Sequence, residues 1–152
     1  STSPPGVMIC DASWSRSMAA FMSSRITAEM PLAPAGSLDV KDWDKSIATN
    51  VRATGSLIPL VEPLLIEGNG TALFLDDPRG GEKFFGAYGA TKAAQIALAQ
   101  SWARETAKHG PRVVIATPAP MPTATRARFF PGEDRAPLID TRAEAARILN
   151  SL

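Results

Sequence analysis

Residues 88–103 read YGATKAAQIALAQSWA, a run whose composition predicts one long helix. The apolar run GTALFL precedes this helix at residues 70–75, and RVVIATP follows it at residues 112–118. Short apolar runs that alternate with a helix are typical of the strands in βαβ units. The order strand, loop, helix and strand therefore predicts an α/β fold with a parallel sheet.

The start of this helix carries Tyr88 and Lys92. Residues four apart lie on one face of a helix, so the Tyr88 hydroxyl and the Lys92 ammonium can point at one site. An unperturbed phenol loses its proton near pH ~10, and it exchanges protons poorly at neutral pH unless a neighbouring cation stabilises the phenolate. The pair therefore indicates general acid–base chemistry, with a solvated helix face as the alternative.

Two further features accompany the pair: Asn50 on another expected helix, and a turn at residues 118–123 after the next strand. Together these features make residues 39–152 resemble the C-terminal half of a short-chain dehydrogenase/reductase. By this resemblance the chain is a shortened and degenerate member of that family. The resemblance implies an α/β, three-layer Rossmann-like fold with a reduced parallel sheet of about three or four strands.

One domain is expected over residues 1–152. A degenerate first strand, loop and helix would occupy residues 1–30, and a proline-containing linker would occupy residues 31–38. The C-terminal half of the family's fold would then run over residues 39–152.

The helix that carries Asn50 shows signals for both of its ends. Asp39 is placed to cap its start, because an aspartate side chain accepts hydrogen bonds from the first free N–H groups of a helix. Pro59 and Pro63 are expected to bend or end it.

The resemblance assigns roles to five residues. Tyr88 would be the general acid/base, Lys92 would lower the pKa of Tyr88 and hold the cofactor ribose, and Asn50 would complete a proton relay. Thr123 would bind the nicotinamide carboxamide of NAD or NADP, and Pro118 would be a further cofactor-binding residue. The implied function is the NAD(P)-dependent oxidation of alcohols or reduction of carbonyl groups on a small-molecule substrate. From the residues alone, Asn50 can equally be an ordinary helix residue, and the turn a proline-rigid loop.

The glycine-rich loop that binds pyrophosphate is the first departure from the family pattern. Asp11, Ser15 and Ser17 stand where glycines permit a tight turn and a close approach of backbone to phosphate. Ser13, Ser15 and Ser17 remain as candidates for phosphate contact. The carboxylate of Asp11 repels a phosphate by about 1 kcal/mol or more. The alternative is a strand-to-helix connection that holds no nucleotide.

The second departure follows the strand at residues 70–75. The family places a serine there to hydrogen-bond the substrate carbonyl, whereas this chain has DDPRGG at residues 76–81. An ionised aspartate only accepts hydrogen bonds and has the wrong charge to stabilise a developing oxyanion. These aspartates either bind a cationic or hydroxylated ligand, or pair with Arg79 or Lys83. Catalysis is therefore expected to be impaired.

The alternative function is that of a non-catalytic relative that dimerises or binds a partner. The helix expected at residues 88–109 is apolar on more than one side, which predicts a homodimer through this helix. Residues 126–137, with Phe129 and Phe130, would cover the substrate by resemblance, or form a contact surface.

Composition excludes several classes of function. The 16 basic and 15 acidic residues give a net charge of +1 without long blocks of one sign, so we expect no nucleic-acid partner and no anionic membrane. No apolar run is long enough to span a bilayer. The single cysteine cannot form an internal disulfide and fits a cytoplasmic location, and the single histidine makes a catalytic triad or a metal site improbable.

Overall fold

The computed structural model describes residues 7–10, by their backbone alone, and residues 32–152. The elements in chain order are β1 (Val7–Cys10), η2 (Ala35–Ser37), α2 (Val40–Ser46), η3 (Ile47–Arg52), α3 (Ala53–Glu67), β2 (Thr71–Leu75), α4 (Gly86–Glu105), β3 (Arg112–Ala116), α5 (Ala124–Phe129) and α6 (Thr141–Asn150). The expected helix after the first strand lies outside the described residues.

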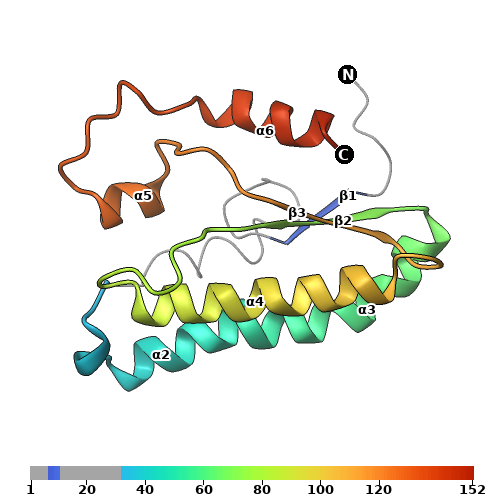
Figure 1. Ribbon diagram of the computed structural model, residues 1–152, viewed down its shortest axis with the longest axis horizontal. Helices are drawn as coiled ribbons and strands as arrows, with labels where there is room; N and C mark the ends of the chain where they lie inside the picture. The colour runs from blue at the N-terminus through green and yellow to red at the C-terminus, as the bar shows by residue number, and fades with distance from the viewer. Residues whose placement is uncertain (1–6, 11–31) are drawn as a thin grey trace.

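The three strands form one parallel sheet in the order β1-β2-β3. Leu73 at the centre of β2 lies opposite Ile9 of β1 and Val114 of β3. Figure 1 shows α2, α3 and α4 on one face of this sheet, and α6 on the other face. The expectation of a three-layer α/β fold with a reduced parallel sheet is confirmed.

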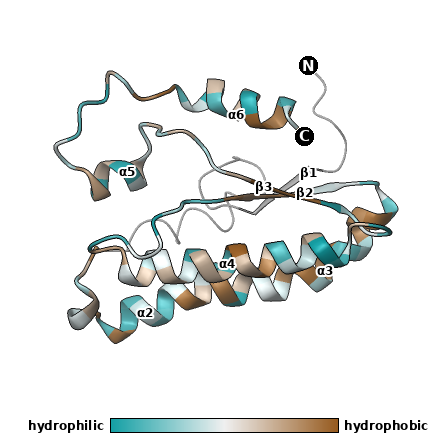
Figure 2. Ribbon diagram, viewed as in Figure 1, coloured by the Kyte–Doolittle hydropathy of each residue, from teal (hydrophilic) through white to brown (hydrophobic). Residues whose placement is uncertain are grey.

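Strand β2 separates two hydrophobic cores, because successive side chains of a strand point to opposite faces of the sheet. One core joins the sheet to α3 and α4, with Leu65, Ala72, Phe74, Ile96, Ala99 and Trp102. The other joins the sheet to α6, with Leu73, Leu75 and Ile148. Figure 2 shows the hydrophobic colouring along β2 and β3, between the two helical layers. Both faces of the sheet are therefore covered, as parallel sheets require.

The helical segment before β2 starts as expected and continues further than expected. The Asp39 carboxylate accepts a hydrogen bond from the Lys41 N–H at 2.8 Å, which confirms its capping role. Of the two expected effects of Pro59 and Pro63, the ending of the helix is wrong, since α3 contains both and runs on to Glu67, and the bending stays a prediction. A proline removes one backbone donor. Here the carbonyls that lose their partners belong to Gly55 and Pro59, which are exposed, so water can solvate them.

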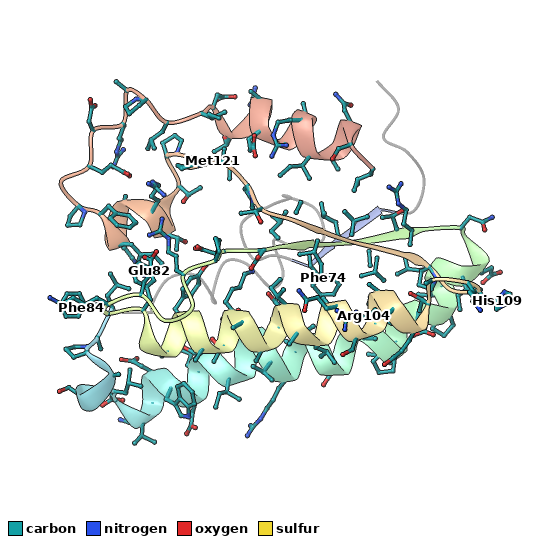
Figure 3. The ribbon with its side chains drawn as sticks, in the orientation of Figure 1. Phe74, Glu82, Phe84, Arg104, His109 and Met121 are labelled. Carbon is teal, nitrogen blue, oxygen red and sulfur yellow. The ribbon has the colours of Figure 1, made fainter. Side chains whose placement is uncertain are left out.

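Helix α4 is slightly shorter at its C-terminal end than the predicted range of residues 88–109. It begins at Gly86 and ends at Glu105, with Thr106 as its C-cap. His109 therefore lies in the exposed turn before β3, as labelled in Figure 3.

Candidate active site

A cavity of about 390 Å³ opens at the carboxyl ends of β2 and β3, the usual location of ligand sites in open α/β sheets. It is lined by residues from η3, from the end of β2 and the β2–α4 connection, from α4, from the segment after β3 and from α5. Glu82 lines it from the β2–α4 connection and Met121 from the segment after β3, and both are labelled in Figure 3. Its volume lies in the range of about 300–1,000 Å³ that is usual for small-molecule sites.

Tyr88 lies in this cavity and is hydrogen-bonded to Asp77. The Tyr88 hydroxyl donates to Asp77 Oδ2 at 3.0 Å, because a carboxylate has no proton to donate. The other oxygen of the same carboxylate, Oδ1, lies 3.2 Å from Nε of Arg79. The ion pair with Arg79, one of the two alternatives expected for the aspartates, is therefore present at Asp77. The structure adds a contact with Tyr88 that the sequence did not indicate.

Gly89 allows the loop that carries Asp77 to lie against α4. A Cβ atom at Gly89 would come within 2.8 Å of the Arg79 carbonyl oxygen and 3.2 Å of the Gly80 Cα. Real Cβ atoms do not approach backbone atoms so closely. The absence of a side chain next to Tyr88 therefore brings the carboxylate within reach of the phenol.

Lys92 is buried at the base of the cavity and belongs to a chain of hydrogen bonds. Its ammonium donates to Gln95 Oε1 at 3.0 Å, one turn further along α4. The Gln95 amide donates to Thr54 Oγ1 at 2.9 Å, and the Thr54 hydroxyl donates to the carbonyl of Asn50 at 2.9 Å. A continuous polar path thus links the lysine to the backbone of Asn50.

The side chain of Asn50 connects the neighbouring helix to α4. Its amide donates to Thr91 Oγ1 at 3.0 Å, and the Thr91 hydroxyl lies 2.8 Å from the carbonyl of Ala87 and 3.2 Å from that of Tyr88. Asn50 belongs to the π-helical segment η3, and such segments are frequent at functional sites. The structure therefore brings Asn50, Tyr88 and Lys92 to one cavity.

The opposite wall of the cavity contains Pro118 and Thr123. The Thr123 hydroxyl accepts a hydrogen bond from the Arg126 N–H at 3.2 Å and caps α5. Between these two residues, the N–H of Ala119 donates to Oε1 of Glu144 at 2.8 Å. This bond anchors the segment after β3 to α6.

Glu144 is a buried carboxylate, with 1% of its side chain exposed. It accepts hydrogen bonds from the Arg147 guanidinium and from the Ala119 N–H. These two hydrogen bonds, that of Arg147 first, lower the pKa of Glu144 to about 2. The group therefore stays ionised at neutral pH.

Two aromatic rings at the C-terminal end of α5, Phe129 and its C-cap Phe130, line the cavity. The Phe129 ring lies 5.3 Å from the Tyr88 ring and 5.1 Å from the Phe85 ring. The Phe130 ring has the Arg79 guanidinium at 4.8 Å and the Arg126 guanidinium at 5.0 Å, within the range of cation–π attraction. The two phenylalanines expected to cover the substrate thus line the cavity.

An ion pair holds the segment after α5 in place. The Arg126 guanidinium binds the carboxylate of Glu133, with Nε 2.6 Å from Oε2. The hydrogen bond from Arg126 lowers the pKa of Glu133. This segment is therefore tied to α5 at the cavity's edge.

The predicted site residues divide into two groups. Asn50, Tyr88, Lys92, Pro118 and Thr123 all line the cavity. The three candidate phosphate-binding serines, Ser13, Ser15 and Ser17, lie outside the described residues.

Several residues that support the site were missed from the sequence, among them Gln95 and Glu144. Gln95 follows Lys92 by three residues and so lies on the same helix face, which is a usable signal. Glu144 contacts a residue 25 positions away, and no sequence pattern indicates that contact.

Within the part of the chain that the structure describes, no helix is long and apolar enough to cross a membrane. In the same part, no three His, Cys, Asp or Glu side chains are grouped to hold a metal ion.

Residues 26–134 match the family model described as short chain dehydrogenase. No curated protein sequence matches the chain at a significant level.

Solved structures similar to this chain include a short chain dehydrogenase from Salmonella enterica serovar Typhi, with 28% identity and a TM-score of 0.73 over 79% of this chain and 51% of that chain. A short chain dehydrogenase from Shigella flexneri has 31% identity and a TM-score of 0.69 over 76% and 46%. A 3-ketoacyl-ACP reductase from Sinorhizobium meliloti has 35% identity and a TM-score of 0.53 over 60% and 38%. The chain thus spans about half the length of the structures it resembles, or less.

Proposed function

The chain belongs to the short-chain dehydrogenase family, and on that basis we propose that it is an NAD(P)-linked oxidoreductase whose turnover is impaired. The observation that carries this proposal is the meeting of Tyr88, Lys92 and Thr123 in one cavity at the carboxyl ends of the strands. A phenol, an ammonium and a hydroxyl in one site supply a proton carrier, a cation and a hydrogen-bonding group.

Each residue has a role in this proposal. Tyr88 exchanges a proton with the substrate oxygen, and Lys92 supplies the positive charge that favours the phenolate. Asn50 holds the far end of the hydrogen-bonded path that begins at Lys92. The nicotinamide ring, when bound, supplies the chemistry of hydride transfer.

The nicotinamide half of a cofactor fits the residues of the cavity. The Lys92 ammonium can bind ribose hydroxyls, the Thr123 hydroxyl can bind the carboxamide, and Pro118 offers an apolar edge. We assign the pyrophosphate to Ser13, Ser15 and Ser17 on the family resemblance alone.

Impairment follows from the Asp77 carboxylate. It accepts the proton of Tyr88 at 3.0 Å, so that proton is directed away from a substrate carbonyl. Its negative charge also opposes the charge that develops on the oxygen during carbonyl reduction. Turnover of carbonyl compounds is therefore slow in this proposal.

The proposal includes a homodimer and a cytoplasmic location. The single cysteine fits a reducing cytoplasm. Support for the dimer comes from exposed apolar side chains on α3 and α4, among them Leu60 at 68%, Leu64 at 67% and Leu98 at 37% exposure. Apolar surface exposed on neighbouring helices gains free energy when a second copy covers it.

The second candidate function is a non-catalytic dimer or partner-binding module. The hydrogen bond between Tyr88 and Asp77 favours it, because that bond engages the hydroxyl that catalysis needs. In this case substitutions at Tyr88 leave the function intact, whereas charged substitutions on the exposed faces of α4 and of the neighbouring α3 remove it.

Calorimetric titration with NADH and NADPH separates the two functions. We expect micromolar binding to the whole chain, weakened at least tenfold in Lys92→Met and unchanged in Lys108→Met, which removes an exposed lysine outside the cavity. Tyr88→Phe should retain binding and lose turnover by about 100-fold or more. No binding of either cofactor at millimolar concentration would contradict the enzyme and favour the module.

A further inference from the structure

Two neighbouring oxygen groups of the cavity, the Tyr88 hydroxyl and the Asp77 carboxylate, have no proton left to donate to a ligand. Tyr88 has one hydroxyl proton, and it is donated to Asp77 Oδ2 at 3.0 Å. The carboxylate of Asp77 has no proton of its own to donate. A ligand that contacts both residues therefore binds best when it donates a hydrogen bond.

The ketone oxygen has no proton and is the poorer match. To bind it, Tyr88 must withdraw its proton from a carboxylate, and hydrogen bonds to charged groups are the stronger class. An alcohol donates its proton to either oxygen and leaves the bond between Tyr88 and Asp77 intact.

The charges of the cavity separate alcohols from amines, the other class of donor. Four basic residues (Arg79, Lys92, Arg126, Arg128) and three acidic ones (Asp76, Asp77, Glu82) line it. The carboxylate next to the phenol is already paired with Arg79, whose Nε lies 3.2 Å from Oδ1. A protonated amine would enter a site with no excess of negative charge, whereas a neutral hydroxyl group meets no such cost.

Apolar side chains of the cavity indicate what kind of body the ligand carries. Leu75, Met121 and Phe129 line the same cavity, and the Phe129 ring lies 5.3 Å from the ring of Tyr88. An apolar or cyclic body attached to the hydroxyl-bearing carbon can therefore be buried against these residues.

We propose that Asp77 and Tyr88 together bind the hydroxyl group of a neutral alcohol, and that Asp77 makes this site prefer alcohols to the corresponding ketones. This inference rests on the proposed function for the use of the cavity as a substrate site. Asp77 acts here as a specificity-determining residue, because it removes the donor that a ketone requires and adds an acceptor that an alcohol uses.

The chain contains one tyrosine, so Tyr88 can be observed alone. The probe is the ring signal of ¹³C-labelled tyrosine in the whole chain, titrated without cofactor with cyclohexanol and, separately, with cyclohexanone. We expect cyclohexanol to shift the signal with about tenfold higher affinity than cyclohexanone. Asp77→Ser replaces the carboxylate by a donor and should remove or reverse this preference.

Asp76→Asn is the matched control, because Asp76 is the adjacent carboxylate and lines the same cavity. It should keep the preference for the alcohol. Asp77→Asn, which retains the shape of the side chain, serves as a second variant if Asp77→Ser does not fold, and it should also lose the preference.

Three results would overturn the inference: equal or tighter binding of the ketone, an unchanged preference in the Asp77 variants, or a Tyr88 signal that responds to neither ligand. A failure to bind NADH or NADPH contradicts the proposed enzyme but leaves the alcohol and ketone titrations unaffected. The two proposals are therefore tested separately.

Discussion

The backbone N–H of Ala119 donates a hydrogen bond to the buried carboxylate of Glu144, 25 residues further along the chain, at 2.8 Å. The same carboxylate pairs with Arg147. One side chain of α6 thereby positions the segment that follows β3 and lines the cavity. A loop that must hold one conformation next to a ligand is thus fixed from outside the cavity.

Stability should depend on pH through this carboxylate. Its pKa is lowered from 4.5 to about 2 in the folded chain, so its contribution is complete above about pH 4.5 and is lost as the pH falls toward 2. Glu144→Gln should lower Tm by several degrees at pH 7 and reduce the loss of stability between pH 5 and pH 2. Urea unfolding at a series of pH values measures both effects. If the free energy of unfolding of the variant falls with pH as steeply as that of the unsubstituted chain, another carboxylate causes the acid sensitivity.

The core between the sheet and α4 should be sensitive to the loss of one ring. Phe74 is fully buried, and its ring meets Trp102 edge to face at a centroid distance of 6.2 Å. Phe74→Ala should destabilise the fold by about 3–5 kcal/mol. Val40→Ala, at a position that is 71% exposed, should change the free energy of unfolding by less than about 0.5 kcal/mol. Equal effects of the two substitutions in urea unfolding would contradict this assignment of the core.

A methyl group at position 89 should separate Tyr88 from Asp77. The added Cβ of Gly89→Ala would meet the carbonyl oxygen of Arg79 at 2.8 Å, so the loop must move away from α4. We expect a loss of about 1–3 kcal/mol in stability. The ring signal of ¹³C-labelled Tyr88 should shift, because the carboxylate that accepts its hydroxyl proton moves away. NMR spectroscopy follows this signal, and Gly36→Ala, where no atom lies within 4 Å of the new Cβ, is the control.

The contact between Lys92 and Gln95 should affect cofactor affinity. Gln95→Leu removes the acceptor of the buried ammonium, and Gln95→Glu keeps an acceptor at the same place. The leucine variant should bind NADPH about tenfold more weakly by calorimetry and lose about 1–3 kcal/mol of stability. The glutamate variant should bind more tightly than the leucine variant. Equal affinities for the two variants would show that Gln95 does not position Lys92.

The exposed side of α3 should control the oligomeric state. Leu60→Glu combined with Leu64→Glu places two charges on the apolar face formed by these residues, and should convert a dimer to a monomer while the helical circular dichroism stays unchanged. Sedimentation velocity measures the size. Ile139→Glu, at another exposed apolar position, is the matched control and should leave the dimer intact. A monomeric unsubstituted chain would exclude this interface.

Patterns that repeat along the sequence predicted most of the fold. The apolar runs gave β2 and β3, and the spacing of Tyr88 and Lys92 on α4 placed both residues on one cavity. Such patterns can be recognised because helix and strand periodicity is a property of a single segment and needs no knowledge of the tertiary structure. The continuation of α3 past Pro59 and Pro63 was not predicted, because exposure of the affected carbonyls depends on the tertiary structure.

The contact between Asp77 and Tyr88 could not be predicted in the same way. It depends on the path of the loop between them, in which Gly81 has φ +88° and Phe84 has φ 71°. The left-handed backbone conformation of Phe84 could not be expected from its residue type, since few non-glycine residues adopt positive φ. The sequence therefore indicated Asp77 and Tyr88 as candidate residues, but not the hydrogen bond between them.

Hydrogen bonds join α4 to the neighbouring helical segment at three levels. They connect Asn50 with Thr91, Thr54 with Gln95, and Glu62 with Trp102, a separation of 41, 41 and 40 residues. Because the separation is nearly constant, the two helices run side by side in the same direction.

Amide hydrogen exchange should therefore see these two helices as one cooperative unit. Exposing the amides of either helix at these levels requires breaking bonds to the other, so protection factors in the two should rise and fall together with denaturant. The amides of α5 are not linked to them in this way and should exchange at lower free-energy cost. We therefore expect the part of the cavity formed by α4 and η3 to open at a higher free-energy cost than the part formed by α5.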